Sequence, residues 1–167
     1  MWYWNNFKSV LENIPYLYIK FIRMNTTISQ QGGVVKKKFK LYAGRNNLSL
    51  FITARKGVKS GLFYDLAEVM QMSEKNLAEI IHVSPRTMSN YKEHKKSLDP
   101  VQSEHLLRLV ALYEKGEELF GNLDEFNYWL QKPFWNDKEK PIDWLVTPGG
   151  IDLIINELTM LAYGDAV

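Results

Sequence analysis

The segment "LAEIIHVSPRTMSNY", Leu77–Tyr91, decides the fold that the sequence predicts. Its first half repeats apolar residues at the spacing of one helical face. After the short link "HV", Ser84 is suited to cap a second helix, and Pro85 takes the first helical position, where a missing N–H costs nothing. Two short helices joined by a tight turn form a helix-turn-helix arrangement. The apolar residues of the first half are Leu77, Ile80 and Ile81.

The second helix has a polar outer face and basic residues behind it. Early residues of such a helix meet base edges in the major groove, and lysines near its end reach phosphates. Arginine can pair with guanine, and asparagine with adenine. The alternative is that these are ordinary surface residues of a small helical bundle. The candidate DNA-binding residues are Ser84, Arg86, Thr87, Ser89, Asn90, Lys92, Lys95 and Lys96.

Helical periodicity continues on both sides of this motif. Gly57 is placed to end a helix over 48–57, and Ser60 and Ser73 are placed to cap the helices that follow them. We therefore expect an all-α protein, with an N-terminal helix-turn-helix domain followed by a small helical domain. The helices are expected at 48–57, 61–70, 74–81, 84–94, 101–119, 123–131, 141–146 and 147–164.

The stretch "WLQKPFWNDKEKPIDWLVTPGG", Trp129–Gly150, contains three tryptophans and three prolines. The prolines and the closing glycine pair restart short helices at sharp angles. We expect Trp129 and Trp144 to be core residues and Trp135 to be an exposed contact. The last helix is apolar around much of its circumference, so it needs cover on more than one side, and part of that cover could be another protein.

Charge is divided along the chain. Residues 1–60 hold 11 Lys and Arg against 1 Glu, a balance of +10. Residues 61–108 hold 6 against 7, and residues 109–167 hold 4 against 11, which gives −1 and −7. The basic part is suited to phosphate, and the acidic part to a basic partner, although each could be only a solvated surface.

Composition argues against several function classes. There is no cysteine, which favours a reducing compartment such as the cytoplasm, and the three histidines lack metal-ligand spacing. No nucleophile–base pair or phosphate-binding glycine loop is recognisable, so we expect neither catalysis nor a cofactor or metal. The aromatic stretch 1–24 is interrupted by charges and is not expected to span a membrane.

The first 47 residues are predicted to form a basic, partly flexible arm. Residues 25–47 are polar and suggest a flexible tail, in which "VVKKKFKLY" could form a short strand. Because "MNTTISQQGG" has the composition of an ordinary N-terminus, translation starting at Met24 is one hypothesis for the preceding segment. The expected domains are then 1–47, 48–121 and 122–167.

Two segments together resemble a known family. "LAEIIHVSPRTMSNY" followed by "LDPVQSEHLLRLVALYEKGEELFG" is similar to the helix-turn-helix half of Xre/MbcA/ParS antitoxins. "WL", "PIDWLVTPGG" and the final "G" resemble the toxin-binding domain of that family, and the likeness covers about residues 48–164. It implies a type II antitoxin that covers the active site of a RES-domain, NAD-consuming toxin and binds its own operator DNA. A homodimer or a larger hetero-oligomer with the toxin is expected.

The resemblance also implies a toxin-binding surface near the C-terminus. We expect the end of the chain to lie at the toxin's substrate pocket, where Tyr163 to Val167 obstruct it. The competing hypothesis is a stand-alone transcriptional regulator whose C-terminal domain serves dimerisation. The candidate toxin-binding residues are Trp135, Thr147, Gly149, Gly150, Tyr163, Gly164, Asp165, Ala166 and Val167.

Overall fold

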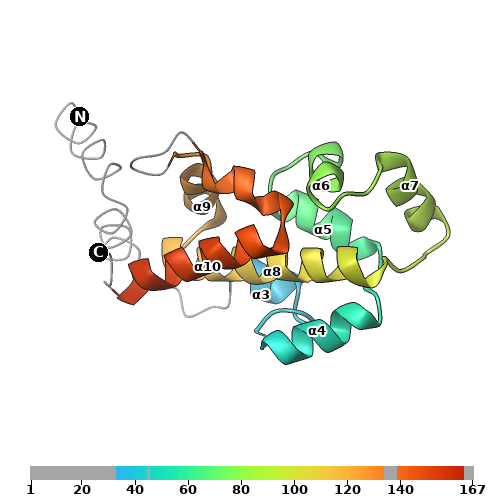
Figure 1. Cartoon of the computed structure of the whole chain (residues 1–167), viewed down its shortest axis with the longest axis horizontal. Helices are drawn as coiled ribbons and strands as arrows, with labels where there is room; N and C mark the ends of the chain where they lie inside the picture. Colours follow the sequence, from blue (N-terminus) through green and yellow to red (C-terminus); the bar gives the residue numbers. More distant parts are fainter. Residues whose placement is uncertain (1–32, 45, 134–138, 164–167) are drawn as a thin grey trace.

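The computed structural model describes residues 33–44, 46–133 and 139–163, and in these ranges the protein is helical without a β-strand (Figure 1). The prediction of an all-α fold is confirmed. The hypothesis of a start at Met24 falls on residues outside these ranges. The elements are α3 (Val34–Lys38), α4 (Asn47–Arg55), α5 (Gly61–Val69), α6 (Glu74–Ile80), α7 (Pro85–Glu93), α8 (Pro100–Phe120), α9 (Leu123–Leu130), the 3-10 helix η1 (Pro141–Val146) and α10 (Pro148–Tyr163).

Local capping signals set most of the helix starts. The hydroxyl of Ser73 accepts a hydrogen bond from the amide of Asn76, and Ser84 caps α7 in the same way. Ser60 precedes α5, but the prediction that its side chain caps the helix is wrong. The Ser60 hydroxyl instead donates to the carbonyl of Tyr91, at 3.3 Å. A tertiary contact has therefore replaced the local cap.

Helix α8 is the longest of the described helices and runs through the middle of the molecule, with α4 on one side and α10 on another (Figure 1). Its buried side chains point in several directions, so it contributes to the core of both halves of the chain. A fully buried leucine stabilises a fold by about 1.5–3 kcal/mol, which makes α8 a large source of stability. Its most deeply buried apolar residues are Leu106, Leu109, Val110, Leu112, Tyr113 and Phe120.

The segment before α4 packs against α8. Val35 and Phe39 are buried, and both carboxylate oxygens of Glu117 accept hydrogen bonds from the amides that begin α3. Glu114 accepts another from the amide of Gly44. The expectation of a flexible tail over residues 25–47 thus does not hold for 33–44, and the suggested strand is wrong because Val34–Lys38 is a helix.

An aromatic cluster fastens α9 to the end of α8. The Phe126 ring stacks on Trp129 and meets the Tyr113 ring edge-on, with ring centres 5.1 Å apart in the second pair. Burial raises the pKa of Tyr113, whose hydroxyl donates to the Asn127 side chain at 2.8 Å. Trp129 is buried as predicted, whereas Trp144 is half-buried and lies at a surface.

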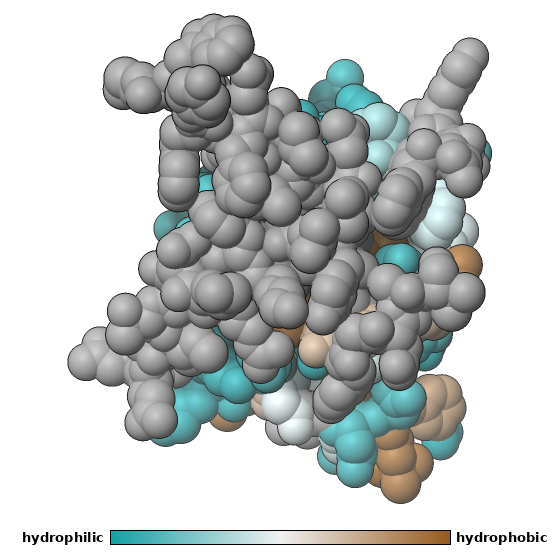
Figure 2. Space-filling model, turned by 90° about the vertical axis from the view of Figure 1, so that its left-hand side faces the viewer, coloured by the Kyte–Doolittle hydropathy of each residue, from teal (hydrophilic) through white to brown (hydrophobic). Residues whose placement is uncertain are grey.

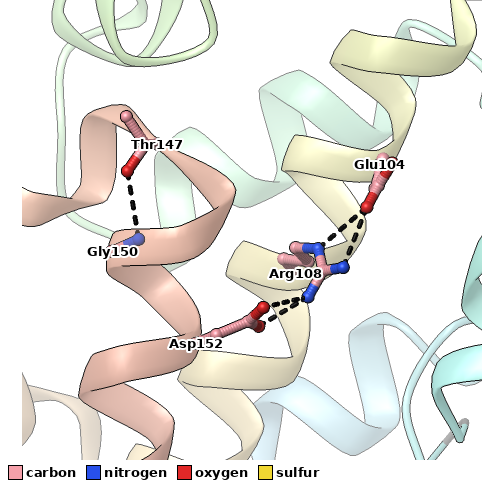
Figure 3. A network of polar contacts seen from close by, with 5 residues as sticks. All are labelled: Glu104, Arg108, Thr147, Gly150 and Asp152. Atoms are coloured by element: carbon pink, nitrogen blue, oxygen red, sulfur yellow. Dashed lines mark hydrogen bonds and ion pairs between the residues drawn. The ribbon is translucent and has the colours of Figure 1, made fainter.

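The glycine pair that starts α10 has two different environments. A side chain at Gly150 would place its Cβ 2.1 Å from the carbonyl oxygen of Trp144. The amide of Gly150 also donates to the Thr147 hydroxyl, so that α10 begins tightly against η1 (Figure 3). At Gly149 a Cβ would meet nothing within 4 Å. Close packing therefore requires glycine at position 150 but not at position 149.

We predict that Gly150→Ala destabilises the fold by about 1–3 kcal/mol, because the added methyl group overlaps the η1 backbone. Gly149→Ala is the matched control. It should stabilise the fold by up to about 1 kcal/mol, since glycine is unfavourable within a helix. Urea denaturation of both variants measures the difference. Equal effects of the two substitutions would contradict this account of the α10 start.

Candidate functional surfaces

The helix-turn-helix unit consists of α6, the turn 81–84 and α7. Met88 is the buried anchor of α7, and the carbonyl of the same residue accepts a hydrogen bond from the Tyr64 hydroxyl on α5. His82 occupies the turn with a φ of 57°, a left-handed conformation in which histidine is found more often than most residues. These contacts fix α7 with its remaining sides toward solvent, at one end of the molecule (Figure 1).

The predicted DNA-binding residues on α7 fall into two groups. The hydroxyls of Ser84, Thr87 and Ser89 are engaged in bonds within the helix, at 2.8–3.1 Å. Arg86 and Asn90 are exposed, and no hydrogen bond or ion pair of their side chains is found within 33–44, 46–133 and 139–163. Arg86 and Asn90 are therefore the side chains most available for base edges, while the serines and Thr87 shape the helix start.

A further basic residue, Lys59, which is not among the candidate DNA-binding residues, lies beside those that follow α7. Lys59 pairs with Ser97 in an antiparallel backbone bridge, and the amide of Ser60 donates to the carbonyl of Lys96. This pairing brings Lys59 next to Lys95 and Lys96, and all three are exposed. Nothing in the local sequence near residue 59 indicates this contact, because its partner lies 38 residues further along the chain.

Other basic residues have partners inside the protein. The ammonium group of Lys92 lies 4.0 Å from the centre of the Tyr64 ring, a cation–π contact. Lys36 and Lys38 of the predicted basic arm form ion pairs with Glu114 and Glu68. Part of the arm's charge is thus compensated within the fold, and the basic surface beside α7 rests mainly on Lys59, Lys95 and Lys96.

The second candidate surface lies where η1 meets α10. Thr147 and Gly150 line a hollow of about 560 Å³, and Gly149 is exposed beside them. Trp135 and Gly164–Val167 lie outside the described residues, as does the side chain of Tyr163. The predicted toxin-binding residues whose side chains the structure describes are therefore Thr147, Gly149 and Gly150, which lie together at the start of α10. The hollow is lined by Glu139, Asp143, Trp144, Val146, Thr147, Gly150 and Leu153.

Apolar side chains extend this surface along α10. Leu153 is 58% exposed, and Met160 lies seven residues later on the same face with 47% exposed. Val146 is also exposed at the end of η1. The opposite face of α10 carries Ile151, Ile154 and Leu158, which are fully buried. The core thus covers one side of the helix and leaves apolar side chains exposed on a second side.

A third candidate surface, which is apolar, lies on α4. Leu48, Phe51 and Ile52 stand at helical spacing on one face and are each about half exposed or more. In Figure 2 brown surface is visible at the lower edge, at the height of α4 in Figure 1. A contiguous apolar face of this kind on a helix marks a contact surface more often than single exposed residues do.

Two histidines bond to η1, His82 from the turn of the helix-turn-helix unit and His105 from α8. The Nε2 of His105 lies 2.7 Å from the carbonyl oxygen of Leu145, and the Nε2 of His82 lies 2.9 Å from that of Val146. Since a carbonyl can only accept, both Nε2 atoms carry the proton. The turn that positions α7 is therefore bonded to a residue that lines the hollow.

An ion-pair network connects α8 to α10. The Arg108 guanidinium on α8 contacts both carboxylate oxygens of Asp152 on α10, at 2.5 and 2.6 Å (Figure 3). On its other side it bonds to Glu104, one helical turn earlier. Because these groups are partly exposed, the pair contributes at most about 1 kcal/mol to stability, but it orients α10 on α8.

Within the described ranges no group of three histidine, aspartate or glutamate side chains is arranged to hold a metal ion. The helices found there are too short or too polar to traverse a bilayer.

Comparison with known proteins concerns the helix-turn-helix unit. Residues 52–111 match the family model of the antitoxin Xre-like helix-turn-helix domain. The match begins in α4, spans α5 to α7 and ends in α8. Among curated proteins no match to the chain is found. The chain thus carries an Xre-like helix-turn-helix domain followed by further helices, which supports an Xre-type antitoxin.

Arg86→Ala should weaken binding to DNA from upstream of the coding sequence by roughly 1–3 kcal/mol if Arg86 reads a base. The control is Lys75→Ala, which removes an exposed cation from α6 and should have a smaller effect. Fluorescence anisotropy with labelled duplexes measures both. If Arg86→Ala binds as tightly as the wild type, Arg86 does not read the operator.

Burial lowers the pKa of His105 below its ordinary value of 6.5. Below pH 6.5 the imidazole binds a proton more readily in the unfolded chain than in the folded protein. Its contribution to stability is therefore fully present above pH 6.5, and the free energy of unfolding should fall as the pH drops below that value. His105→Gln can still donate to Leu145 and should flatten this dependence. Urea unfolding between pH 5 and 8 measures how the free energy of unfolding depends on pH. If this dependence is as steep in His105→Gln as in the wild type, His105 is not its cause.

Proposed function

We propose that the chain is the antitoxin of a type II toxin–antitoxin module. It covers the active site of a RES-domain, NAD-consuming toxin and binds its own operator DNA. The observation that carries the proposal is an Xre-like helix-turn-helix unit bonded to a C-terminal helical layer with an uncovered apolar and acidic surface. The setting is the cytoplasm, where operator and toxin are both present.

DNA binding rests on α7 and on the lysines beside it. Arg86 and Asn90 would meet base edges, whereas Lys59, Lys95 and Lys96 would meet phosphates; the exposure of all five side chains supports this. A single helix in one groove gives limited affinity, so the repressor acts as a dimer or in a larger complex with the toxin. The exposed apolar face of α4 is the surface that a second copy would cover.

Toxin binding rests on the surface formed by η1 and α10. Leu153 and Met160 supply apolar area, and Glu139 and Asp143 line the hollow with Leu153, within residues 109–167, which carry a balance of −7. We further propose that the last residues, Tyr163–Val167, extend from the end of α10 into the toxin's pocket. That part of the proposal comes from the family resemblance, since these residues fall outside the described side chains.

The test is co-expression of the chain with a RES-domain toxin, followed by a measurement of affinity. Leu153→Asn should weaken binding by about ten-fold or more, because a leucine buried in an interface contributes about 1.5–3 kcal/mol. Leu41→Asn is the matched control, since Leu41 is 72% exposed and lies outside η1 and α10.

Growth rescue by the wild type and the control, with poorer rescue by Leu153→Asn, is the expected result. If the wild type neither binds the toxin nor restores growth, the antitoxin proposal fails. Self-association that is lost in Leu153→Asn would then favour the alternative of a regulator that dimerises through its C-terminal helices.

A further inference from the structure

We infer that the hollow between η1 and α10 receives a basic side chain, arginine or lysine, from the toxin. The inference rests on the proposed function and names the chemistry by which that surface recognises its partner. The walls of the hollow, the carboxylates at its edge and the hydrogen bonds that hold those carboxylates support it.

The walls are suited to the long stem of such a side chain. Val146 and Leu153 are both more than 40% exposed and line the hollow, as does the half-buried Trp144. Gly150 leaves one part of the lining without a side chain, and the volume of about 560 Å³ accommodates a long residue. Arginine and lysine bury their methylene stems along apolar surfaces of this kind while the charged end seeks a polar group.

Two carboxylates stand at the edge of these walls and are already oriented. Oε2 of Glu139 accepts a hydrogen bond from the Trp144 indole at 2.7 Å. Oδ2 of Asp143 accepts another from the amide of Lys140 at 3.1 Å. Each carboxylate has a second oxygen with lone pairs to offer, so the two side chains are held in place and can still accept from a guanidinium or ammonium group.

The Trp144 side chain holds one of these carboxylates at the wall of the hollow. Its indole N–H is directed to Glu139, and its side chain lines the same hollow as the two carboxylates. Arginine suits these carboxylates especially, because its planar group can bond to a carboxylate through two N–H groups.

Other occupants fit less well. An apolar side chain would remove Glu139 and Asp143 from water without giving them a partner, which is costly. An anionic group would be repelled by both. Lys140 is adjacent in sequence to Glu139, but it does not line the hollow. Residues 109–167, which include the site, carry a balance of −7, and this charge also favours a cationic partner.

The experiment removes the two charges and keeps the two hydrogen bonds. In the double variant Glu139→Gln and Asp143→Asn, the amide oxygens can still accept from Trp144 and Lys140. The control double variant, Glu79→Gln and Glu118→Gln, makes the same change in net charge at exposed positions on α6 and α8. Thermal unfolding should show equal stability for both.

Affinity for a RES-domain toxin is then measured by titration calorimetry at 50 and 300 mM salt. The site variant should bind about ten-fold or more weakly than the control, since bonds between charged groups are the strong ones. Its affinity should also depend less on salt. A second pair of variants, Leu153→Arg and Leu153→Gln, does not depend on those hydrogen bonds. Leu153→Arg places the chain's own cation at the hollow, so this variant should bind the toxin more weakly than Leu153→Gln.

The outcomes separate the inference from the proposed function. If the wild type binds the toxin and the site variant matches the control in affinity and salt dependence, the inference is overturned and the antitoxin proposal stands. Equal binding by the two Leu153 variants would also overturn it. If the wild type does not bind the toxin at all, both fail together.

Discussion

Burial of α8 on more than one side is the constraint on which the rest of the structure depends. One side of the helix packs against α4 and α5, and another packs against α9 and α10. His105 and Arg108 add polar bonds from the same helix to η1 and α10. Neither half of the chain can complete its core without α8, so the two candidate surfaces belong to one packed unit.

This arrangement brings the two surfaces close together. The turn before α7 contains His82, whose imidazole donates to Val146, and Val146 lines the hollow between η1 and α10. A partner that covers the hollow therefore contacts a residue bonded to the turn that positions the DNA-binding helix. Close by, a Cβ at Gly150 would overlap the carbonyl of Trp144, so α10 begins directly against η1 only with glycine at this position.

Local signals made much of the fold predictable, and tertiary contacts account for the rest. The caps at Ser73 and Ser84 and the apolar spacing of α6 and α8 act within a few residues, so the sequence indicates them directly. Ser60 was misassigned because its hydroxyl finds a carbonyl 31 residues away. The packing of residues 33–44 against α8 is not predictable for the same reason. Glu117, which accepts from the amides of Val34 and Val35, lies more than 80 residues further along the chain.

The candidate surfaces were predictable to different degrees. Position within the motif was enough to suggest Arg86 and Asn90, while Lys59 joins the site only through backbone pairing with Ser97. Thr147 and Gly149 were expected on the toxin side from the family resemblance, but the hollow beside them depends on the packing of η1 against α10. Glu139 and Asp143 carry no sequence signal beyond their charge.

The central claim is that a helix-turn-helix protein presents η1 and the first turns of α10 to a toxin. Hydrogen–deuterium exchange of the chain, with and without a RES-domain toxin, tests it most directly. The account predicts that the toxin slows exchange in residues 139–156 and leaves α4 unaffected. Slower exchange confined to α4 to α7, with none in η1 or α10, would contradict it.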